Sequence, residues 1–117
     1  MKNKMKGYRS ERKVRLLFEA RGWEVVRAGG SLGYYDLIAF KDGKCAFLQI
    51  KSTKKNVFYY YGYKDEMFMG FPFFLVVDFG RGNIKVTKPV EKINESEGEN
   101  LDIFLNKLIN DLSENKP

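Results

Sequence analysis

The chain has 117 residues, of which 44% are hydrophobic and 31% are charged. This size suits one folded domain, because a second core would be too small to offset its own ordering entropy. The absence of histidine excludes His-ligated zinc and any Ser-His or Cys-His catalytic pair, and a single cysteine, Cys45, excludes an internal disulfide. No apolar run approaches the ~20 residues that span a bilayer, and the first residues lack the apolar stretch of a secretion signal. We therefore expect a soluble, cytoplasmic protein with no membrane partner.

The net charge of +6 is unevenly distributed along the chain. Residues 1–55 hold 14 basic and 5 acidic side chains, a net charge of +9, whereas residues 56–117 hold 7 and 10, a net charge of −3. A basic half of this kind favours a polyanionic partner such as nucleic acid. A lysine-rich solvated surface is the alternative.

The first predicted element is an amphipathic helix over residues 8–21. Apolar residues, among them Val14 and Phe18, recur there at helical spacing, and Gly22 follows as a left-handed stop. Glu11 lies three residues before Val14 and seven before Phe18, so it shares the inward-facing stripe. A carboxylate on that stripe marks a candidate functional residue.

A β-hairpin is predicted next. Residues 23–28 and 34–40 are rich in strand formers and are separated by the glycine-rich loop 29–33. Asp42-Gly43 is a strong two-residue hairpin signal that leads into a third strand over residues 45–51. The second and third strands should therefore be antiparallel neighbours.

The hairpin signal also predicts the register of these two strands. With Asp42-Gly43 as the loop, Lys41 faces Lys44 and Asp36 faces Gln49, with Cβ atoms about 4.5–5.5 Å apart. Lys51 lies two residues beyond Gln49 and so projects from the same face of the sheet. We expect three polar side chains to converge at the open end of the hairpin.

The remaining elements complete a mixed α/β arrangement within one domain, residues 1–117. The domain is expected to consist of a core over residues 1–88, a connector over 89–100 and a C-terminal helix over 101–113. Asn100 is a candidate N-cap for that helix. The intervening segments are predicted to be a strand over 57–61, a short helix over 63–69, a buried strand over 73–79, a turn over 80–83 and a strand over 84–87.

The converging polar side chains have the chemistry of a site for a divalent cation. Mg²⁺ and Mn²⁺ take hard oxygen ligands, and Glu11, Asp36, Gln49 and the backbone carbonyl of Ile50 all offer oxygen atoms. Lys51 supplies a cation that can orient a nucleophilic water or stabilise a developing phosphorane charge. This combination suits phosphodiester hydrolysis.

A plain surface ion pair is the competing interpretation of the same residues. Asp-to-Lys pairs across a hairpin are common and contribute under about 1 kcal/mol. Against it, Gln49 and Lys51 follow the apolar residues Cys45 and Phe47 on the same face. The face becomes polar at one end only, which favours a site.

Four sequence blocks resemble the archaeal-type Holliday junction resolvases of the PD-(D/E)xK nuclease superfamily. They are GYRSERKVRLL at 7–17, GWEVVRAGGS at 22–31, DLIA at 36–39 and QIK at 49–51, within a resemblance that covers about residues 5–60. The resemblance implies a restriction-endonuclease-like α/β fold, with a central mixed β-sheet flanked by helices. It also implies a Mg²⁺-dependent endonuclease, with Mn²⁺ able to substitute, that cleaves four-way DNA junctions as a homodimer in recombination and repair.

The resemblance also assigns roles to individual residues. Glu11, Asp36 and Gln49 match metal ligands, Lys51 matches the catalytic lysine, and Ser31 matches a loop serine at the scissile phosphate. Basic residues near these positions are expected to bind DNA phosphates, Arg12 and Arg27 by the resemblance and the others by clustering: Lys4, Lys6, Arg9, Lys54 and Lys55.

Gln49 is a departure from the family pattern, which usually has glutamate at this position. An amide oxygen can still bind a metal ion, but it lacks the charge that attracts a divalent ion. Two alternatives to a junction resolvase therefore stay open. One is a non-catalytic DNA-binding module of the same fold, and the other is a nuclease of the same chemistry that acts on other DNA.

The second departure concerns the dimer. The segment over residues 62–70 is shorter than the family's second helix, which contributes to the dimer surface. Residues 58–61, Tyr63 and residues 71–74 form a dense aromatic run that should lie mostly in the core. Its outward-facing members could stack on bases or bury against a second subunit, and we favour the second subunit.

Overall fold

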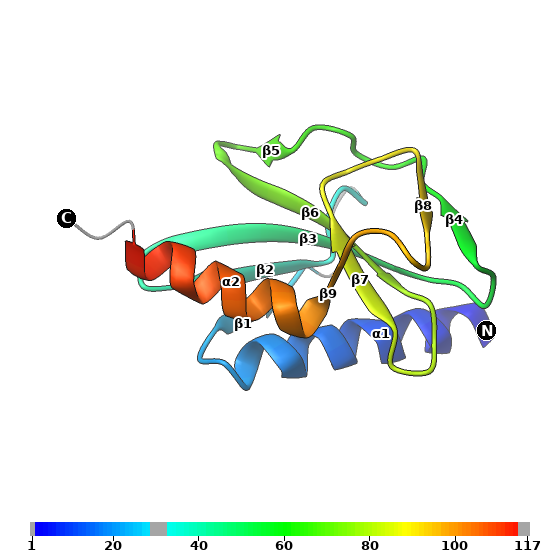
Figure 1. Ribbon diagram of the computed structural model, residues 1–117, viewed down its shortest axis with the longest axis horizontal. Helices are drawn as coiled ribbons and strands as arrows, with labels where there is room; N and C mark the ends of the chain where they lie inside the picture. The colour runs from blue at the N-terminus through cyan, green and yellow to red at the C-terminus, as the bar shows by residue number, and fades with distance from the viewer. Residues whose placement is uncertain (1, 29–32, 115–117) are drawn as a thin grey trace.

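The computed structural model describes residues 2–28 and 33–114, and its described side chains are those of residues 8–28 and 33–108 (Figure 1). A seven-stranded mixed sheet has the order β1-β2-β3-β6-β7-β9, with β5 attached to β6, and β4 and β8 form a separate two-stranded sheet. The elements in chain order are α1 (Lys2–Glu19), β1 (Glu24–Arg27), β2 (Leu37–Lys41), β3 (Lys44–Ser52), β4 (Val57–Tyr59), β5 (Met67–Phe68), β6 (Phe71–Asp78), β7 (Ile84–Thr87), β8 (Lys92–Asn94), β9 (Glu99–Asn100) and α2 (Leu101–Glu114). The predicted fold class, a central mixed sheet with flanking helices, is confirmed.

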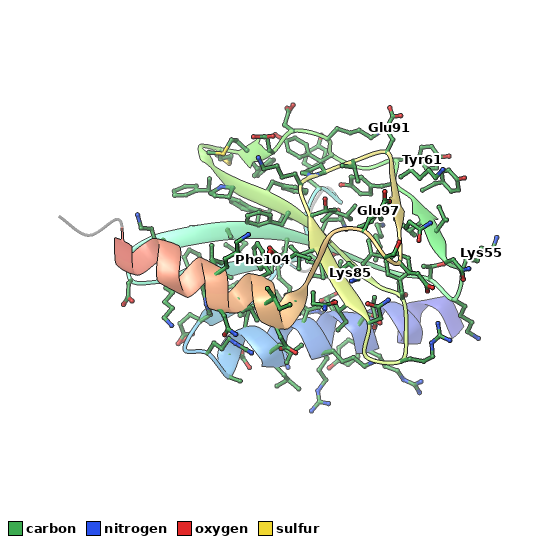
Figure 2. The ribbon with its side chains drawn as sticks, in the orientation of Figure 1. Lys55, Tyr61, Lys85, Glu91, Glu97 and Phe104 are labelled. Carbon is green, nitrogen blue, oxygen red and sulfur yellow. The ribbon has the colours of Figure 1, made fainter. Side chains whose placement is uncertain are left out.

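Both helices cover the same face of the sheet (Figure 1). Val14 and Phe18 of α1 pack with Val76 of β6 and with Leu105 of α2 in one buried cluster. Phe104 of α2 lies edge-on against the ring of Phe74 of β6, with centroids 4.9 Å apart. Figure 2 shows Phe104 between α2 and the sheet. Burial of such side chains stabilises the fold by about 1.5–3 kcal/mol each. No helix in the described part of the chain is both long and apolar enough to cross a membrane.

The opposite face of the sheet holds a second apolar cluster. Leu75 and Val77 of β6 alternate with Val76 and pack there with Tyr60 and Ile93 from the β4–β8 region. Because side chains alternate along a strand, β6 is buried on both faces, as its nearly continuous apolar run predicts. The two helices therefore cover one face of the sheet, and the β4–β8 pair covers the other.

The predicted hairpin is confirmed in turn and in register. Asp42 and Gly43 both have positive φ, 48° and 77°, as a two-residue turn matched to the strand twist requires. Lys41 pairs with Lys44 and Leu37 with Leu48. Beyond the hairpin, β3 continues in a parallel ladder with β6.

The predicted short helix over residues 63–69 is wrong. Met67–Phe68 form β5, which turns back onto β6 through Met69 and Gly70, both with positive φ (51° and 86°). Phe68 is held among other rings, including that of Phe47 at 4.9 Å. Tertiary packing of the aromatic side chain outweighs the local helical pattern.

Other predicted boundaries also differ from the structure. The first helix begins at Lys2 instead of residue 8, and the connector over 89–100 contains two short strands, β8 and β9. These strands escaped prediction because they are two to three residues long, so no periodicity can mark them. Backbone pairing with β4 and β7 holds them in place.

The aromatic run divides between core and surface. Tyr60 and Phe73 are buried, whereas Tyr59, Tyr61 and Phe71 are exposed and the other aromatic side chains of the run are half-buried. The prediction that the run lies mostly in the core is therefore wrong. Figure 2 shows Tyr61 on the same side of the molecule as Glu91, which precedes β8. Tyr59, at the end of β4, and Tyr61 therefore point outward on either side of the buried Tyr60.

Candidate functional site

The site is built around Asp36, which directly precedes β2. Its Oδ2 accepts a hydrogen bond from the backbone amide of Ile50 at 2.7 Å and another from Nε2 of Gln49 at 2.7 Å. The backbone N–H of Asp36 donates to the carbonyl of Leu48 at 2.7 Å. Two hydrogen bonds to the carboxylate and one from the backbone N–H therefore hold Asp36 opposite Gln49, at the position that the hairpin register predicts.

The pKa of Asp36 lies above its usual value. Burial is the main cause, and the nearby charge of Glu11 raises the pKa further, whereas the amide of Ile50 and the charge of Lys51 act in the opposite direction. An ionised carboxylate that is desolvated beside a second carboxylate is stabilised by a cation. The electrostatics of the site therefore suit a bound cation.

The donor set fits Mg²⁺ or Mn²⁺ with a small number of protein ligands. No group of three or more His, Cys, Asp or Glu side chains able to hold a metal ion occurs among the described residues. The candidate oxygens are therefore the carboxylates of Asp36 and Glu11 with two neutral groups, the Gln49 amide and the Ile50 carbonyl. Mg²⁺ is commonly bound by one or two carboxylates with several waters. Gln49 directs its nitrogen at Asp36, so its amide must rotate before the oxygen can join Asp36 at an ion.

Glu11 reaches the site from α1, and it is already paired. Its side chain is mostly buried, and Oε1 accepts a charge-assisted hydrogen bond from Nε of Arg27 at 2.7 Å. Arg27 also lies over the ring of Tyr8, 5.1 Å from the centroid. Arg27 therefore neutralises a carboxylate that lies within electrostatic range of Asp36.

Arginines surround Glu11. A small pocket of about 10 Å³, room for about one water, is lined by Tyr8, Glu11, Arg12, Arg15, Arg27 and Leu37. Nε of Arg15 is buried there with no hydrogen-bond partner in the described part of the structure. Arg15 is not among the residues expected above to bind DNA, and it lies one helical turn from both Glu11 and Arg12 on the same face of α1.

Lys51 extends the polar face beyond Gln49. The parallel ladder pairs Gln49 with Leu75 and Lys51 with Val77, so both side chains lie on the face opposite α1. Lys51 is exposed, and its charge lowers the pKa of Asp36. The structure thus brings Asp36, Gln49 and Lys51 to one end of one face.

The other predicted residues are distributed as follows. Arg9 and Arg12 are exposed on α1, and Lys54 and Lys55 are exposed just after β3. Figure 2 shows Lys55 at the end of the molecule where α1 begins. Ser31 lies outside the described residues, and Lys4 and Lys6 lie in the part of α1 whose side chains are not described: the structure places only their backbone.

Tyr60 packs against Leu75 and Val77, on the same face of the sheet as Gln49 and Lys51, and its hydroxyl is buried without a hydrogen-bond partner among the described residues. The side chain is 1% exposed. Burial raises the pKa of Tyr60 to about 12, with a further contribution from the charge of Asp36, and the amide of Tyr63 opposes the shift without reaching hydrogen-bond geometry. A Cβ on Gly62 would lie 2.5 Å from this hydroxyl, so only glycine fits there.

Replacing Tyr60 with phenylalanine is expected to raise the free energy of unfolding by about 1 kcal/mol. The ring and its packing stay, while a buried polar atom that costs about 1–3 kcal/mol when unpaired is removed. Urea unfolding measures the change, and Tyr59→Phe, at an exposed position, is the matched control with no expected effect. A clear loss of stability for Tyr60→Phe would show that the hydroxyl is hydrogen-bonded in solution.

Comparison with known proteins bears on this arrangement. The family model described as archaeal Holliday junction resolvase (Hjc) matches residues 2–110. Among solved structures, the chain is similar to Hjc of Archaeoglobus fulgidus, a Holliday junction resolvase from an archaeal hyperthermophile, with a TM-score of 0.65 and 17% identity over 86% of this chain and 96% of that chain. The comparison with curated proteins finds no match. The structural likeness supports the fold, and the family match over nearly the whole length shows that the chain belongs to the archaeal Holliday junction resolvase family.

Proposed function

We propose that the chain is a metal-dependent endonuclease that resolves four-way DNA junctions by paired phosphodiester cleavage. The observation that carries the proposal is the meeting of the Asp36 carboxylate, the Gln49 amide and the Lys51 ammonium on one face, within electrostatic range of Glu11. The family's members are junction resolvases by name, and the basic surface around Glu11 suits DNA phosphates.

Each residue has a proposed role. Asp36 and Glu11 would hold Mg²⁺ or Mn²⁺ with the Gln49 oxygen and the Ile50 carbonyl as neutral ligands, and the ion would supply Lewis acidity and an acidified water. Lys51 orients the attacking water or stabilises charge on the phosphate. Arg12, Arg15 and Arg27 bind neighbouring phosphates, and Ser31 is assigned to the scissile phosphate by the family resemblance.

The direct test is a cleavage assay on a four-way junction with Mg²⁺ or Mn²⁺. We expect paired nicks from the wild type and none from Asp36→Ala. A flap and a linear duplex at the same salt concentration separate junction resolution from a nuclease that acts on other DNA. Absence of nicking by the wild type, or equal nicking by Asp36→Ala, contradicts the proposal.

A non-catalytic DNA-binding module is the second candidate. The observation in its favour is that Gln49 and Ile50 already satisfy Oδ2 of Asp36 without a metal ion. Calorimetric titration with Mn²⁺ separates the two candidates. Uptake of Mn²⁺ that Asp36→Asn abolishes excludes the module, whereas junction binding with no Mn²⁺ uptake supports it.

Arg27→Gln is expected to strengthen Mn²⁺ binding to the free protein and to weaken junction binding. Removal of the guanidinium releases the Glu11 carboxylate but also removes a phosphate contact, so the two affinities change in opposite directions. Calorimetry measures the first and fluorescence anisotropy in EDTA the second. Arg81→Gln, at an exposed position outside the residues expected to bind DNA, is the control and should change neither affinity. If Mn²⁺ binds more weakly after Arg27→Gln, Arg27 does not compete for Glu11.

We also propose that the protein acts in the cytoplasm as a single nuclease domain that forms a homodimer, since two symmetric nicks need two sites. Met67, Met69 and Phe71 are exposed around the β5 turn, and an exposed apolar patch of this kind favours association. Met69→Lys is expected to shift the protein to monomer in sedimentation equilibrium, whereas Ile103→Lys, at an exposed position on α2 outside the aromatic run, should not. An unchanged mass for Met69→Lys would place the dimer surface elsewhere.

A further inference from the structure

Asp78 is a buried carboxylate outside the residues discussed so far. It ends β6 and is 5% exposed. Its Oδ2 accepts a hydrogen bond from the hydroxyl of Ser10 at 2.9 Å and lies 3.6 Å from Nζ of Lys13. Its Oδ1 accepts a hydrogen bond from the amide of Gly80 at 2.8 Å. Both carboxylate oxygens are therefore occupied, one by α1 and one by the turn after β6.

These contacts place Asp78 between two parts of the candidate site. Ser10, its partner on α1, directly precedes Glu11. On the sheet, Asp78 pairs with Ser52, the residue after Lys51, and the carbonyl of Asp78 accepts a hydrogen bond from the amide of Thr53 at 3.0 Å. One residue thus links the helix that carries Glu11 to the strand that carries Lys51.

Apolar packing does not require a carboxylate at this position. Val14 and Phe18 already attach α1 to the sheet by burial, and burying a charged group carries a desolvation cost that an apolar side chain avoids. Apolar contacts are not directional, whereas a hydrogen bond fixes the rotation of the helix and its position along the sheet. A misplacement of about 1 Å at a reacting centre can reduce the rate by about 10²-fold.

We propose that Asp78 is a positioning residue, which holds Ser10 so that Glu11 faces Asp36 at a fixed distance from the strand of Lys51. This inference rests on the proposed function for its cleavage readout. It assigns no contact between Asp78 and the substrate, because Asp78 lies on the α1 face of the sheet and acts through the helix.

A double-mutant cycle tests the proposal. Ser10→Ala removes the hydroxyl that reaches Asp78, and Glu11→Gln removes the charge that the hydroxyl is proposed to position. We expect Ser10→Ala to lower the single-turnover cleavage rate about tenfold at saturating junction and to weaken Mn²⁺ binding, with junction affinity in EDTA unchanged. In the Glu11→Gln background, Ser10→Ala should have no further effect on the cleavage rate or on Mn²⁺ affinity, because the charge that Ser10 is proposed to position is already absent.

Further variants separate positioning from general stability. Asp78→Ala, which removes the acceptor of the Ser10 hydroxyl, should match Ser10→Ala in cleavage and Mn²⁺ affinity at a temperature where both are fully folded. Arg21→Ala, which removes the ion pair between the turn after α1 and Asp102 of α2, is the control that should leave both unchanged. Equal losses from Arg21→Ala, or losses from Ser10→Ala that persist in the Glu11→Gln background, would overturn the positioning role.

The outcome also distinguishes this inference from the proposed function. A wild type that cleaves junctions but shows additive effects of Ser10→Ala and Glu11→Gln refutes the positioning role alone. A wild type that binds Mn²⁺ without cleaving junctions refutes the proposed function. In that case the double-mutant cycle tests the positioning role through Mn²⁺ affinity alone. A wild type that does neither refutes both.

Discussion

Gln49→Glu is expected to raise the affinity for Mn²⁺ by at least about tenfold, because ligand charge is a main determinant of affinity for a hard divalent ion. In the metal-free protein the same change should lower the free energy of unfolding. The variant loses the hydrogen bond from Nε2 of Gln49 to Oδ2 of Asp36. It places a second carboxylate next to that of Asp36, and two adjacent carboxylates cannot both ionise freely. Added Mn²⁺ should then stabilise Gln49→Glu more than it stabilises the wild type.

Calorimetry and thermal unfolding with and without Mn²⁺ measure these effects. Gln49→Met is the matched control, since it keeps the length of the side chain but offers no oxygen, and it should weaken Mn²⁺ binding. Two carboxylates this close are also expected to titrate as a pair, so Mn²⁺ affinity should depend more steeply on pH in Gln49→Glu. Unchanged Mn²⁺ affinity in both variants would mean that residue 49 is not a ligand.

Asp36→Asn is expected to abolish cleavage while leaving the metal-free protein at least as stable as the wild type at pH 7. Loss of an outer-shell partner commonly costs 10–100-fold in metal affinity or activity, so loss of a direct ligand should reduce the cleavage rate by more than about 10²-fold. An asparagine oxygen can accept the same hydrogen bonds from Ile50 and Gln49. The variant therefore removes the charge and keeps the contacts.

The dependence on pH follows from the raised pKa of Asp36. The folded state binds the proton more tightly than the unfolded state, so the contribution of Asp36 to stability is fully present below the ordinary aspartate pKa and is lost as pH rises through the raised value. The amide side chain in the variant does not titrate. The stability advantage of Asp36→Asn over the wild type should therefore appear at neutral pH and disappear in acid, as urea unfolding at both pH values would show. An advantage that is constant with pH would contradict this account.

The parts of the fold that could be predicted from sequence were those with a local physical cause. The Asp42-Gly43 turn determines a register by counting, so the pairing of Asp36 with Gln49 followed without any long-range information. The helix stripe around Val14 and Phe18 followed in the same way from periodicity. By contrast, the β5 turn depends on rings that are distant in sequence, and residues 63–69 alone favour the wrong structure.

The same distinction applies to the site. Residues of one hairpin were placed correctly, because strand alternation decides which side chains share a face. The ion pair between Glu11 and Arg27 and the contact between Ser10 and Asp78 join residues 16 and 68 positions apart. No local pattern indicates such pairs, since they arise only when α1 packs on the sheet. Asp78 carried one faint signal, as the polar residue that interrupts a nearly continuous apolar run.

The tight turn between Lys41 and Lys44 makes spacing as important as residue identity. Inserting a single amino acid there, with the strands still joined by a loop of two, would pair Asp36 with a neighbour of Gln49 whose side chain points toward α1. Every catalytic candidate would still be encoded, yet the aspartate would face an apolar partner and ion binding would be lost. With a loop of two residues, only insertions that lengthen β2 and β3 by the same number of residues keep Asp36 opposite Gln49. We therefore expect insertions in natural variants of this hairpin to lengthen both strands equally.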